Sequence, residues 1–230
     1  MDANFAVIQV GGSFGRSSFF EMFHKSFVTM LLQKIDSLYS CINRTVILEC
    51  AAIKRVRENM GLNNVKVMIP FCRTVDEGKK VIQVMEQNGL DRNKDTSLQI
   101  YMMAEIPSNV LLAEKFAEIF DGFSIGSNDL TQLTLGIDRD SSVVSNLFSE
   151  QNEAAKMMMS MVIEKAKGAG TKIGLCGQAP SDYPEFAQFL VQKGINSISF
   201  NPDALIKGIE NIKLAEEQLR PKEKPVFFAI

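Results

Sequence analysis

Histidine and cysteine are scarce in this sequence, and those present are dispersed. The chain of 230 residues has one histidine, His24, and four cysteines, none of them in a Cys-x-x-Cys pair. Zinc sites need several closely spaced His, Cys or acidic ligands, so a zinc site is not expected. The cysteine spacing does not match a disulfide framework either, and the twelve methionines fit a reducing interior. We therefore expect free thiols and a cytoplasmic protein.

A surplus of basic charge is also missing, as is any long apolar run. The formal net charge is −2, which gives no electrostatic reason to expect nucleic acid as a partner. No apolar stretch approaches the ~20 residues of a membrane span, and the N-terminus lacks the basic-then-apolar pattern of a signal peptide. We expect no membrane partner. The composition, 46% hydrophobic and 23% charged, is that of an ordinary globular protein.

Strand-like and helix-like segments alternate regularly from residue 65 onward. The predicted strands are residues 65–70, 98–106, 123–126, 171–177 and 195–201. The predicted helices are residues 75–88, 107–119, a short one near Thr131, 152–167, one capped by Ser181 and ended by Gly194, and 203–219. Continuous apolar strands separated by helices predict an α/β fold with a parallel sheet. Five such units fit a doubly wound sheet or part of a (β/α)8 TIM-type barrel. A barrel would be incomplete, with early strands missing or replaced, because a full one needs about 250 residues.

A further helix is predicted over residues 45–60, before the alternation begins. Its apolar residues recur at helical spacing, and Gly61 is suited to end it. Three basic residues, Lys54, Arg55 and Arg57, lie in its second half, where the helix dipole favours positive charge. We interpret this basic cluster as a solvated helix face.

The first 43 residues are the hardest part to interpret. Residues 4–12 could form one strand, but the glycine-rich residues 11–18 lack the spacing of a phosphate-binding loop. We divide the chain into a divergent N-terminal segment, residues 1–43, a barrel portion, residues 44–219, and a C-terminal tail, residues 220–230.

Acidic residues follow two consecutive predicted strands. Glu105 comes directly after the apolar run YMMA, and Asp129 follows the next strand. A carboxylate in such a place is costly to bury unless it is paired, protonated or bound to a metal. Because strand ends meet at one edge of an α/β sheet, the two carboxylates could share a Mg²⁺ ion completed by water and substrate oxygens. The alternative is an internal salt bridge, for instance between Glu105 and Arg73.

The turn after the third predicted strand combines Gly126, Ser127, Asn128 and Asp129. It offers free backbone N–H groups at the positive end of a helix beside one carboxylate, which suits an anionic ligand held with a metal ion. The simpler alternative is an ordinary βα turn with a helix cap. Cys176 ends another strand, and it is either an inert core residue or a thiol that exchanges a proton with a substrate carbon.

Five motifs bear a resemblance to known enzymes. They are VMIPFCRT (67–74), MMAEIPSN (102–109), DGFSIGSNDLTQLTLGIDRDS (121–141), GLCGQAPSD (174–182) and INSISFNPD (195–203). In this order they resemble the C-terminal domain of the phosphoenolpyruvate synthases, the pyruvate, water dikinases of the PEP-utilising enzyme family. The resemblance, over roughly residues 48–216, implies a (β/α)8 barrel that binds pyruvate or phosphoenolpyruvate with Mg²⁺. Cys176 matches the acid/base that handles the substrate methyl group.

The resemblance also implies roles for the other candidate residues. Glu105 and Asp129 match the family's metal ligands, which also lie against the substrate. Gly126, Ser127 and Asn128 match the turn that holds the substrate carboxylate and phosphoryl group. These assignments agree with the chemistry expected from the residues themselves, since Mg²⁺ stabilises an enolate oxygen as charge develops on it.

The chain departs from the family pattern in its first 43 residues. His24 lies in no segment that resembles a phosphohistidine domain, and no segment resembles an ATP-grasp domain. The arginine-bearing motif expected before the barrel is not reproduced, so Arg16 receives no role. The resemblance implies that both domains come from elsewhere. This chain alone is not expected to convert ATP, pyruvate and water to AMP, phosphoenolpyruvate and phosphate, a gluconeogenic transferase reaction.

Two other functions stay open at this point. The chain could be a non-catalytic fragment that serves dimerisation, as a homodimer, or regulation, because an open barrel leaves sheet edges that must be covered. It could also be a stand-alone Mg²⁺-dependent aldolase or lyase acting on 2-oxo acids.

Overall fold

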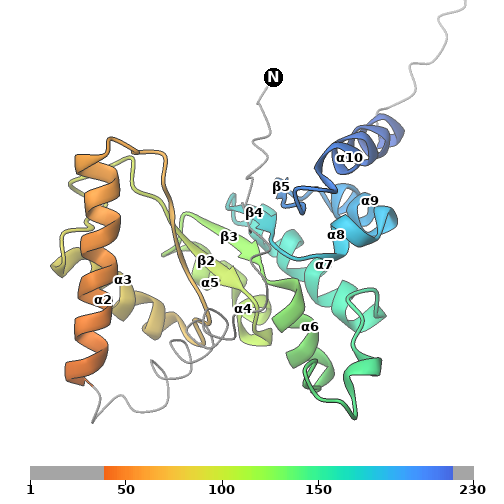
Figure 1. Cartoon of the computed structure of the whole chain (residues 1–230), viewed down its shortest axis with the longest axis horizontal. Coiled ribbons are helices and arrows are strands. Elements are labelled where there is room, and N and C mark those ends of the chain that lie inside the picture. Colours follow the sequence, from red (N-terminus) through yellow and green to blue (C-terminus); the bar gives the residue numbers. More distant parts are fainter. Residues whose placement is uncertain (1–38, 220–230) are drawn as a thin grey trace, which may run out of the picture.

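Residues 39–219 are the part of the chain that the computed structural model describes (Figure 1). Helix α2 (Tyr39–Lys54) comes first and continues into one π-helical turn, η1 (Arg55–Asn59). The strands are β1 (Val67–Ile69), β2 (Ile100–Ala104), β3 (Gly122–Ile125), β4 (Lys172–Leu175) and β5 (Ser197–Ile198). The helices that follow β1, β2 and β3 are α3 (Val75–Gln87), α4 (Pro107–Leu111), α5 (Ala113–Ala117), α6 (Ser127–Leu135), the 3-10 turn η2 (Ser145–Leu147) and α7 (Glu153–Gly168). The last helices are α8 (Ala179–Asp182), α9 (Pro184–Lys193) and α10 (Leu205–Leu219).

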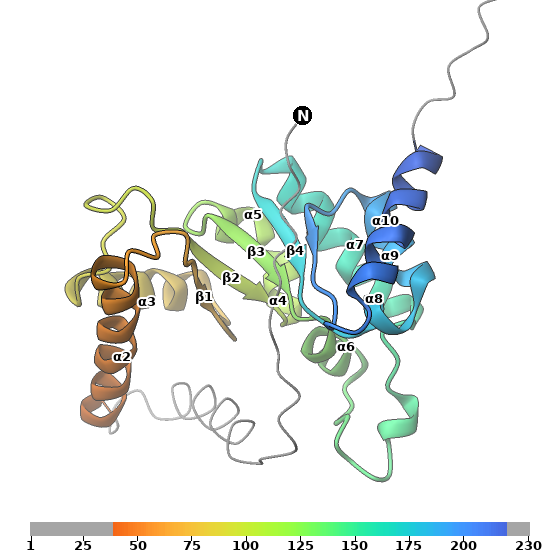
Figure 2. The same ribbon diagram turned by 45° about the horizontal axis from the view of Figure 1, so that its top comes forward.

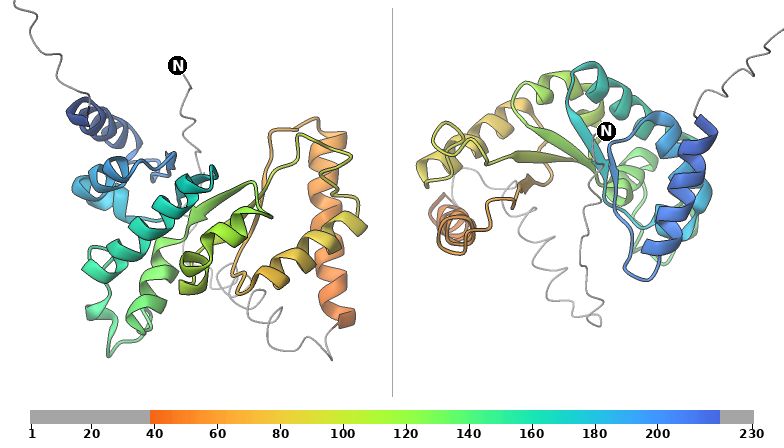
Figure 3. Two further views of the ribbon diagram at one scale, coloured as in Figure 1. Left: turned by 180° about the vertical axis from the view of Figure 1, so that it is seen from behind. Right: turned by 90° about the horizontal axis from the view of Figure 1, so that it is seen from above.

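The five strands form one parallel sheet whose spatial order is the same as their order in the chain. Figures 2 and 3 show the sheet curving, with the connecting helices on its outer side. A doubly wound sheet reverses its strand order at a switch point, and this sheet does not within the described residues. The prediction of an α/β fold with a parallel sheet is therefore confirmed, and the doubly wound alternative is wrong. Closure into a barrel stays a prediction.

The core lies between the sheet and the outer helices. Along β2, Ile100, Met102 and Ala104 are fully buried while the residues between them are half-buried, as the alternation of side chains on a strand requires. On α7 the buried positions recur three and four residues apart and form one apolar stripe toward the sheet: Ala155, Met159, Val162, Ile163 and Ala166. This packing fixes the strand ends relative to one another, and so positions the residues that follow them.

Local sequence signals explain most helix boundaries. Helix α3 begins with a capping box in which the Thr74 hydroxyl accepts from the Glu77 backbone N–H and the Glu77 carboxylate accepts from that of Thr74. Gly61 and Gly194 end their helices with φ of 71° and 78°, a conformation that favours glycine. The predicted stops at Gly61 and Gly194 are confirmed.

Two boundary predictions are wrong. The predicted helix over residues 107–119 is two short helices, because the chain leaves helical geometry at Leu112, where ψ is 25°. Ser181 does not cap a helix. It lies inside α8, and its hydroxyl accepts a hydrogen bond from the backbone N–H of Asn201 at 2.9 Å, which ties the end of β5 to this helix.

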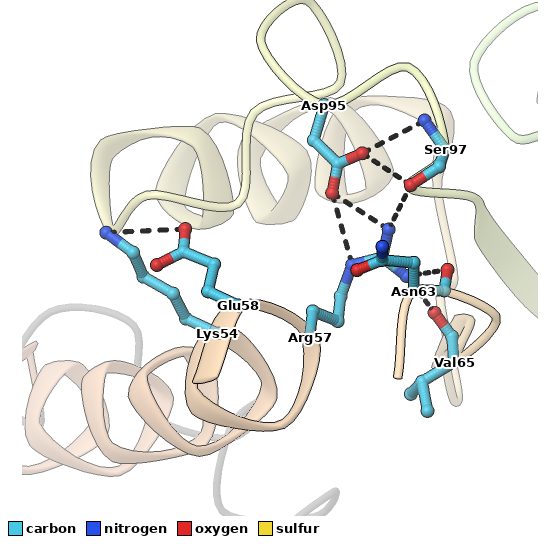
Figure 4. A network of polar contacts seen from close by, with 7 residues as sticks. All are labelled: Lys54, Arg57, Glu58, Asn63, Val65, Asp95 and Ser97. Atoms are coloured by element: carbon cyan, nitrogen blue, oxygen red, sulfur yellow. Dashed lines mark hydrogen bonds and ion pairs between the residues drawn. The ribbon is translucent and has the colours of Figure 1, made fainter. Parts of the chain in front are cut away.

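The basic cluster at the end of α2 is not a solvated face throughout. Arg57 is only 2% exposed. Its guanidinium donates to the Asp95 carboxylate at 2.8 Å, to the Ser97 hydroxyl at 2.7 Å and to the backbone carbonyls of Asn63 and Val65 (Figure 4). The interpretation fails for Arg57 because two of its partners, Asp95 and Ser97, lie on the loop before β2, 38 and 40 residues away in the chain. We call this set of contacts the Arg57 clamp.

Several predictions fall on residues that the structure does not describe. These are the possible strand at residues 4–12, the glycine-rich residues 11–18, Arg16, His24 and the tail at residues 220–230, and they stay predictions. Among the described residues, no helix is long and apolar enough to cross a membrane.

Candidate functional site at the ends of the strands

Three candidate residues lie in one row across the sheet. The register pairs Ala104 of β2 with Ile125 of β3, and Ile125 with Leu175 of β4. The next residue on each strand is therefore Glu105, Gly126 and Cys176, side by side at the carboxyl edge. The Cys176 backbone N–H donates to the Ile125 carbonyl at 3.0 Å, which extends the pairing one step beyond the strands. Figure 2 shows β3 leading from this edge directly into α6.

Glu105 is a buried carboxylate, 2% exposed, held by backbone on both sides. Its Oε1 accepts from the Phe71 N–H at 2.6 Å. The Asn109 side chain accepts from the Glu105 N–H and donates to the Cys72 carbonyl at 2.6 Å, which ties the end of β2 to the loop after β1. Arg73 does not pair with Glu105, since its guanidinium lies 4.0 Å from Glu77. The salt-bridge alternative is therefore not observed.

The backbone at Phe71 is strained. Its φ is 52°, a left-handed value that a bulky aromatic residue rarely adopts. Strain of this kind persists where surrounding contacts impose it and clusters at functional sites. Here it accompanies the N–H that donates to Glu105, so the loop after β1 is shaped around the carboxylate.

Glu105 and Asp129 face one another. The pKa of Glu105 is raised to about 8, mainly by burial and also by the Asp129 charge and a hydrogen bond between the two carboxyl groups, against the lowering effect of the Phe71 N–H. Among the described residues, no group of three or more His, Cys, Asp or Glu side chains is arranged for a metal ion. Two adjacent carboxylates without a basic partner fit a cation that takes its remaining ligands from water and substrate.

The turn before α6 has Gly126 as the residue preceding the helix, and Ser127, Asn128 and Asp129 as its first three residues. No side chain caps this helix, so the simpler alternative of a capped turn is not observed. Backbone N–H groups in a first helical turn have no acceptor within the helix. A side chain on Gly126 would place its Cβ 2.9 Å from the Glu105 Cβ, so only glycine fits there. Ser127 is fully buried, whereas Asn128 and Asp129 are half-buried.

Cys176 is half-buried beside the two carboxylates. Burial raises the pKa of its thiol, the charges of Glu105 and Asp129 raise it further, and a hydrogen bond with Ser124 acts in the opposite direction. Cys50 and Cys72, by contrast, are buried in the core. Cys176 is thus the thiol that the fold brings to the acidic site.

Sequence reasoning missed two residues that line the back of this site. Glu150 precedes α7 and is only 8% exposed, and Gly177 follows Cys176. A Cβ on Gly177 would clash with the Ser127 hydroxyl and lie 3.3 Å from the Glu150 Oε1. Glu150 stands in the polar run SEQN next to a helix start, where an exposed acidic residue is ordinary, so no local signal marks it as buried.

Comparison with known proteins identifies the family. The sequence profile described as PEP-utilising enzyme, PEP-binding domain matches residues 39–217. The chain belongs to the PEP-utilising enzyme family. The resemblance read from the five motifs is confirmed, and the residues described above lie within its PEP-binding domain.

Curated relatives bear the name phosphoenolpyruvate synthase. Over 172 residues, which is 75% of this chain, identity is 63% to the protein of Synechocystis sp., 60% to that of Aquifex aeolicus and 55% to that of Escherichia coli. The aligned region is 21%, 20% and 21% of those proteins. The chain therefore spans about a fifth of the length of these relatives.

Proposed function

We propose that this chain is the pyruvate- and phosphoenolpyruvate-binding part of a phosphoenolpyruvate synthase-type enzyme and that it binds these ligands with Mg²⁺. The observation that carries the proposal is the meeting of Glu105 and Asp129 beside Cys176 at one edge of the sheet. Identity of 55–63% to proteins named phosphoenolpyruvate synthase supports it. The fold that supports it best is the arc of a (β/α)8 barrel.

Each residue has a distinct role in this proposal. Glu105 and Asp129 would hold Mg²⁺, which when bound stabilises negative charge on the enolate oxygen of the substrate. The N–H groups at the start of α6 and the Asn128 amide orient the substrate carboxylate and phosphoryl oxygens. Gly126 keeps this turn close to Glu105. Cys176 gives a proton to the substrate methyl carbon or takes one from it, at Sγ.

The complete reaction needs more than these residues. Conversion of ATP, pyruvate and water to AMP, phosphoenolpyruvate and phosphate requires a phosphoryl donor, which we propose comes from ATP-grasp and phosphohistidine domains outside the described residues. For residues 39–219 the proposal is therefore ligand binding and proton exchange at the methyl carbon.

Isothermal titration of the full chain with oxalate, an enolate mimic, tests the proposal. We expect Mg²⁺-dependent heat that is lost in Glu105→Gln, which keeps an acceptor for the Phe71 N–H but removes the charge. Glu118→Ala, on an exposed position of the same βα unit, is the matched control and should bind like the wild type. Absence of heat up to ~1 mM oxalate would count against the proposal, because it would mean a binding free energy weaker than about −4 kcal/mol.

A second candidate function, dimerisation, is favoured by one observation. Within the described residues, β1 and β5 are edge strands of the sheet, and parallel edges present unpaired N–H and C=O groups. A homodimer that covers these edges would give the chain a structural role. Analytical ultracentrifugation tests this candidate, and a stable monomer at all concentrations would exclude it.

A further inference from the structure

Glu150 is a buried acid with no role in the proposed chemistry. It lies in the loop before α7, and it is 8% exposed although it carries a carboxylate. Burial raises the pKa of this carboxyl group, and the Asp182 charge raises it further. The Ser127 hydroxyl, the backbone N–H of Ala179 and the charge of Arg139 act in the opposite direction. Removing the Glu150 carboxylate from water therefore costs free energy, a cost that a solvent-exposed acid in a loop does not have.

The carboxylate lies where two site turns meet. Gly177 contacts the Ser127 hydroxyl so closely that any side chain would clash with it, and Glu150 Oε1 borders the same space. The Ser127 Oγ and the Glu150 Oε1 are both buried and have no hydrogen-bond partner of normal geometry among the described residues. Buried polar atoms of this kind need a partner, and both of these atoms border the space beside Gly177.

We propose that Glu150 is a positioning residue that joins the Cys176 turn to the Asp129 turn. Its carboxyl group holds the Ser127 hydroxyl, directly or through one buried water, and the Ala179 N–H. Ser127 is two residues before Asp129, and Ala179 is three residues after Cys176. The link therefore sets the distance between the metal-side carboxylate and the thiol. This inference rests on the proposed function for its purpose, but not for its geometry.

The reactivity of the Cys176 thiol reports on the link between Glu150 and Ser127 in the full chain. We propose to follow iodoacetamide labelling of each cysteine by peptide mass spectrometry in the wild type and in Glu150→Ala, Glu150→Asp and Glu150→Gln. Buried Cys50 and Cys72 are internal references for general unfolding. Glu153→Ala, which removes an exposed carboxylate three residues further on, is the matched control.

We expect Glu150→Ala to speed labelling of Cys176 by roughly fivefold or more, because a freed turn exposes the thiol, with Cys50 and Cys72 unchanged. Glu150→Asp, one methylene shorter, should show part of this effect. Glu150→Gln keeps length and hydrogen-bonding capacity and should restore wild-type labelling. The Ala variant should also weaken Mg²⁺-dependent oxalate binding by roughly tenfold.

Two results would overturn the proposal. One is Cys176 labelling in Glu150→Ala and Glu150→Asp at the wild-type rate. The other is a parallel rise at Cys50 and Cys72, which would show a loss of general stability instead of a local link. If the wild type fails to bind oxalate with Mg²⁺, the proposed function fails, but the labelling comparison still decides the role of Glu150.

Discussion

Arg57 and Glu105 are both ionisable side chains that are only 2% exposed, yet their surroundings differ. The Arg57 guanidinium donates to a carboxylate, a hydroxyl and two backbone carbonyls. Glu105 accepts from one backbone N–H and faces a second carboxylate, Asp129. The Arg57 charge is satisfied by its own chain, so removing it would leave buried partners unpaired, whereas two facing carboxyl groups keep a proton until a cation takes its place. The comparison separates a structural site from a ligand site.

Removal of the Arg57 side chain is expected to have the largest effect on stability. Arg57→Ala leaves the Asn63 and Val65 carbonyls without their donor and empties a buried space, so we expect a loss of ~3 kcal/mol in the free energy of unfolding. Urea unfolding followed by circular dichroism measures it. Arg55→Ala, on an exposed position of the same turn, is the control and should change stability by less than ~0.5 kcal/mol. Equal losses in the two variants would contradict the clamp.

Removal of the Glu105 carboxylate should weaken ligand binding but leave the stability of the fold intact, the opposite of the result expected for Arg57. Glu105→Gln is expected to weaken Mg²⁺-dependent oxalate binding by roughly a hundredfold, or about 2.7 kcal/mol, because one of two charged ligands is lost. Without Mg²⁺ and above the pKa of Glu105, the same variant should be at least as stable as the wild type, since it removes the repulsion between two carboxylates. Titration calorimetry and urea unfolding measure the two effects. A variant that is less stable without the metal would show that Glu105 is a structural charge like Arg57.

The pH dependence of stability should follow Glu105. The pKa of this acid is raised on folding from 4.5 to about 8, so the folded protein binds the proton more tightly. Its contribution to stability is complete below the unfolded pKa and is lost as the pH rises through the folded pKa. We therefore expect the unfolding free energy without metal to fall between pH ~5 and ~8. Because Glu150 acts in the same direction, the difference between wild type and Glu105→Gln is the measurement, and identical pH profiles would refute the assignment.

The smallest expected effect concerns the cap of α3. Thr74→Ala removes one half of the capping box and should cost about 1 kcal/mol in the free energy of unfolding. Oxalate binding should stay unchanged, because the hydroxyl serves the helix and not the acidic site. Thermal unfolding and titration calorimetry test the two halves of this prediction. A loss of binding would place the start of α3 in the ligand site.

Much of the fold and of the site follows from local sequence patterns. The alternation of apolar strands and helices predicts the parallel sheet. The positions of Glu105, Asp129 and Cys176 just after strands predict one shared edge, because parallel strands in register bring their ends together. The sequence could not show that Leu112 interrupts a helix or that Ser181 lies inside one, since these depend on neighbouring packing.

What the sequence by itself determined is the order of the elements and the chemistry gathered at the strand ends. Which polar side chains are buried was decided only by the tertiary structure. Arg57 was interpreted as solvated, but Asp95, its partner, is 38 residues away. Glu150 had no distinguishing local context, but its carboxylate lies beside Gly177, which follows β4, close to Ser127 at the start of α6. Periodicity reports the face on which a residue lies, whereas burial of a charge depends on distant segments that meet it only in the folded chain.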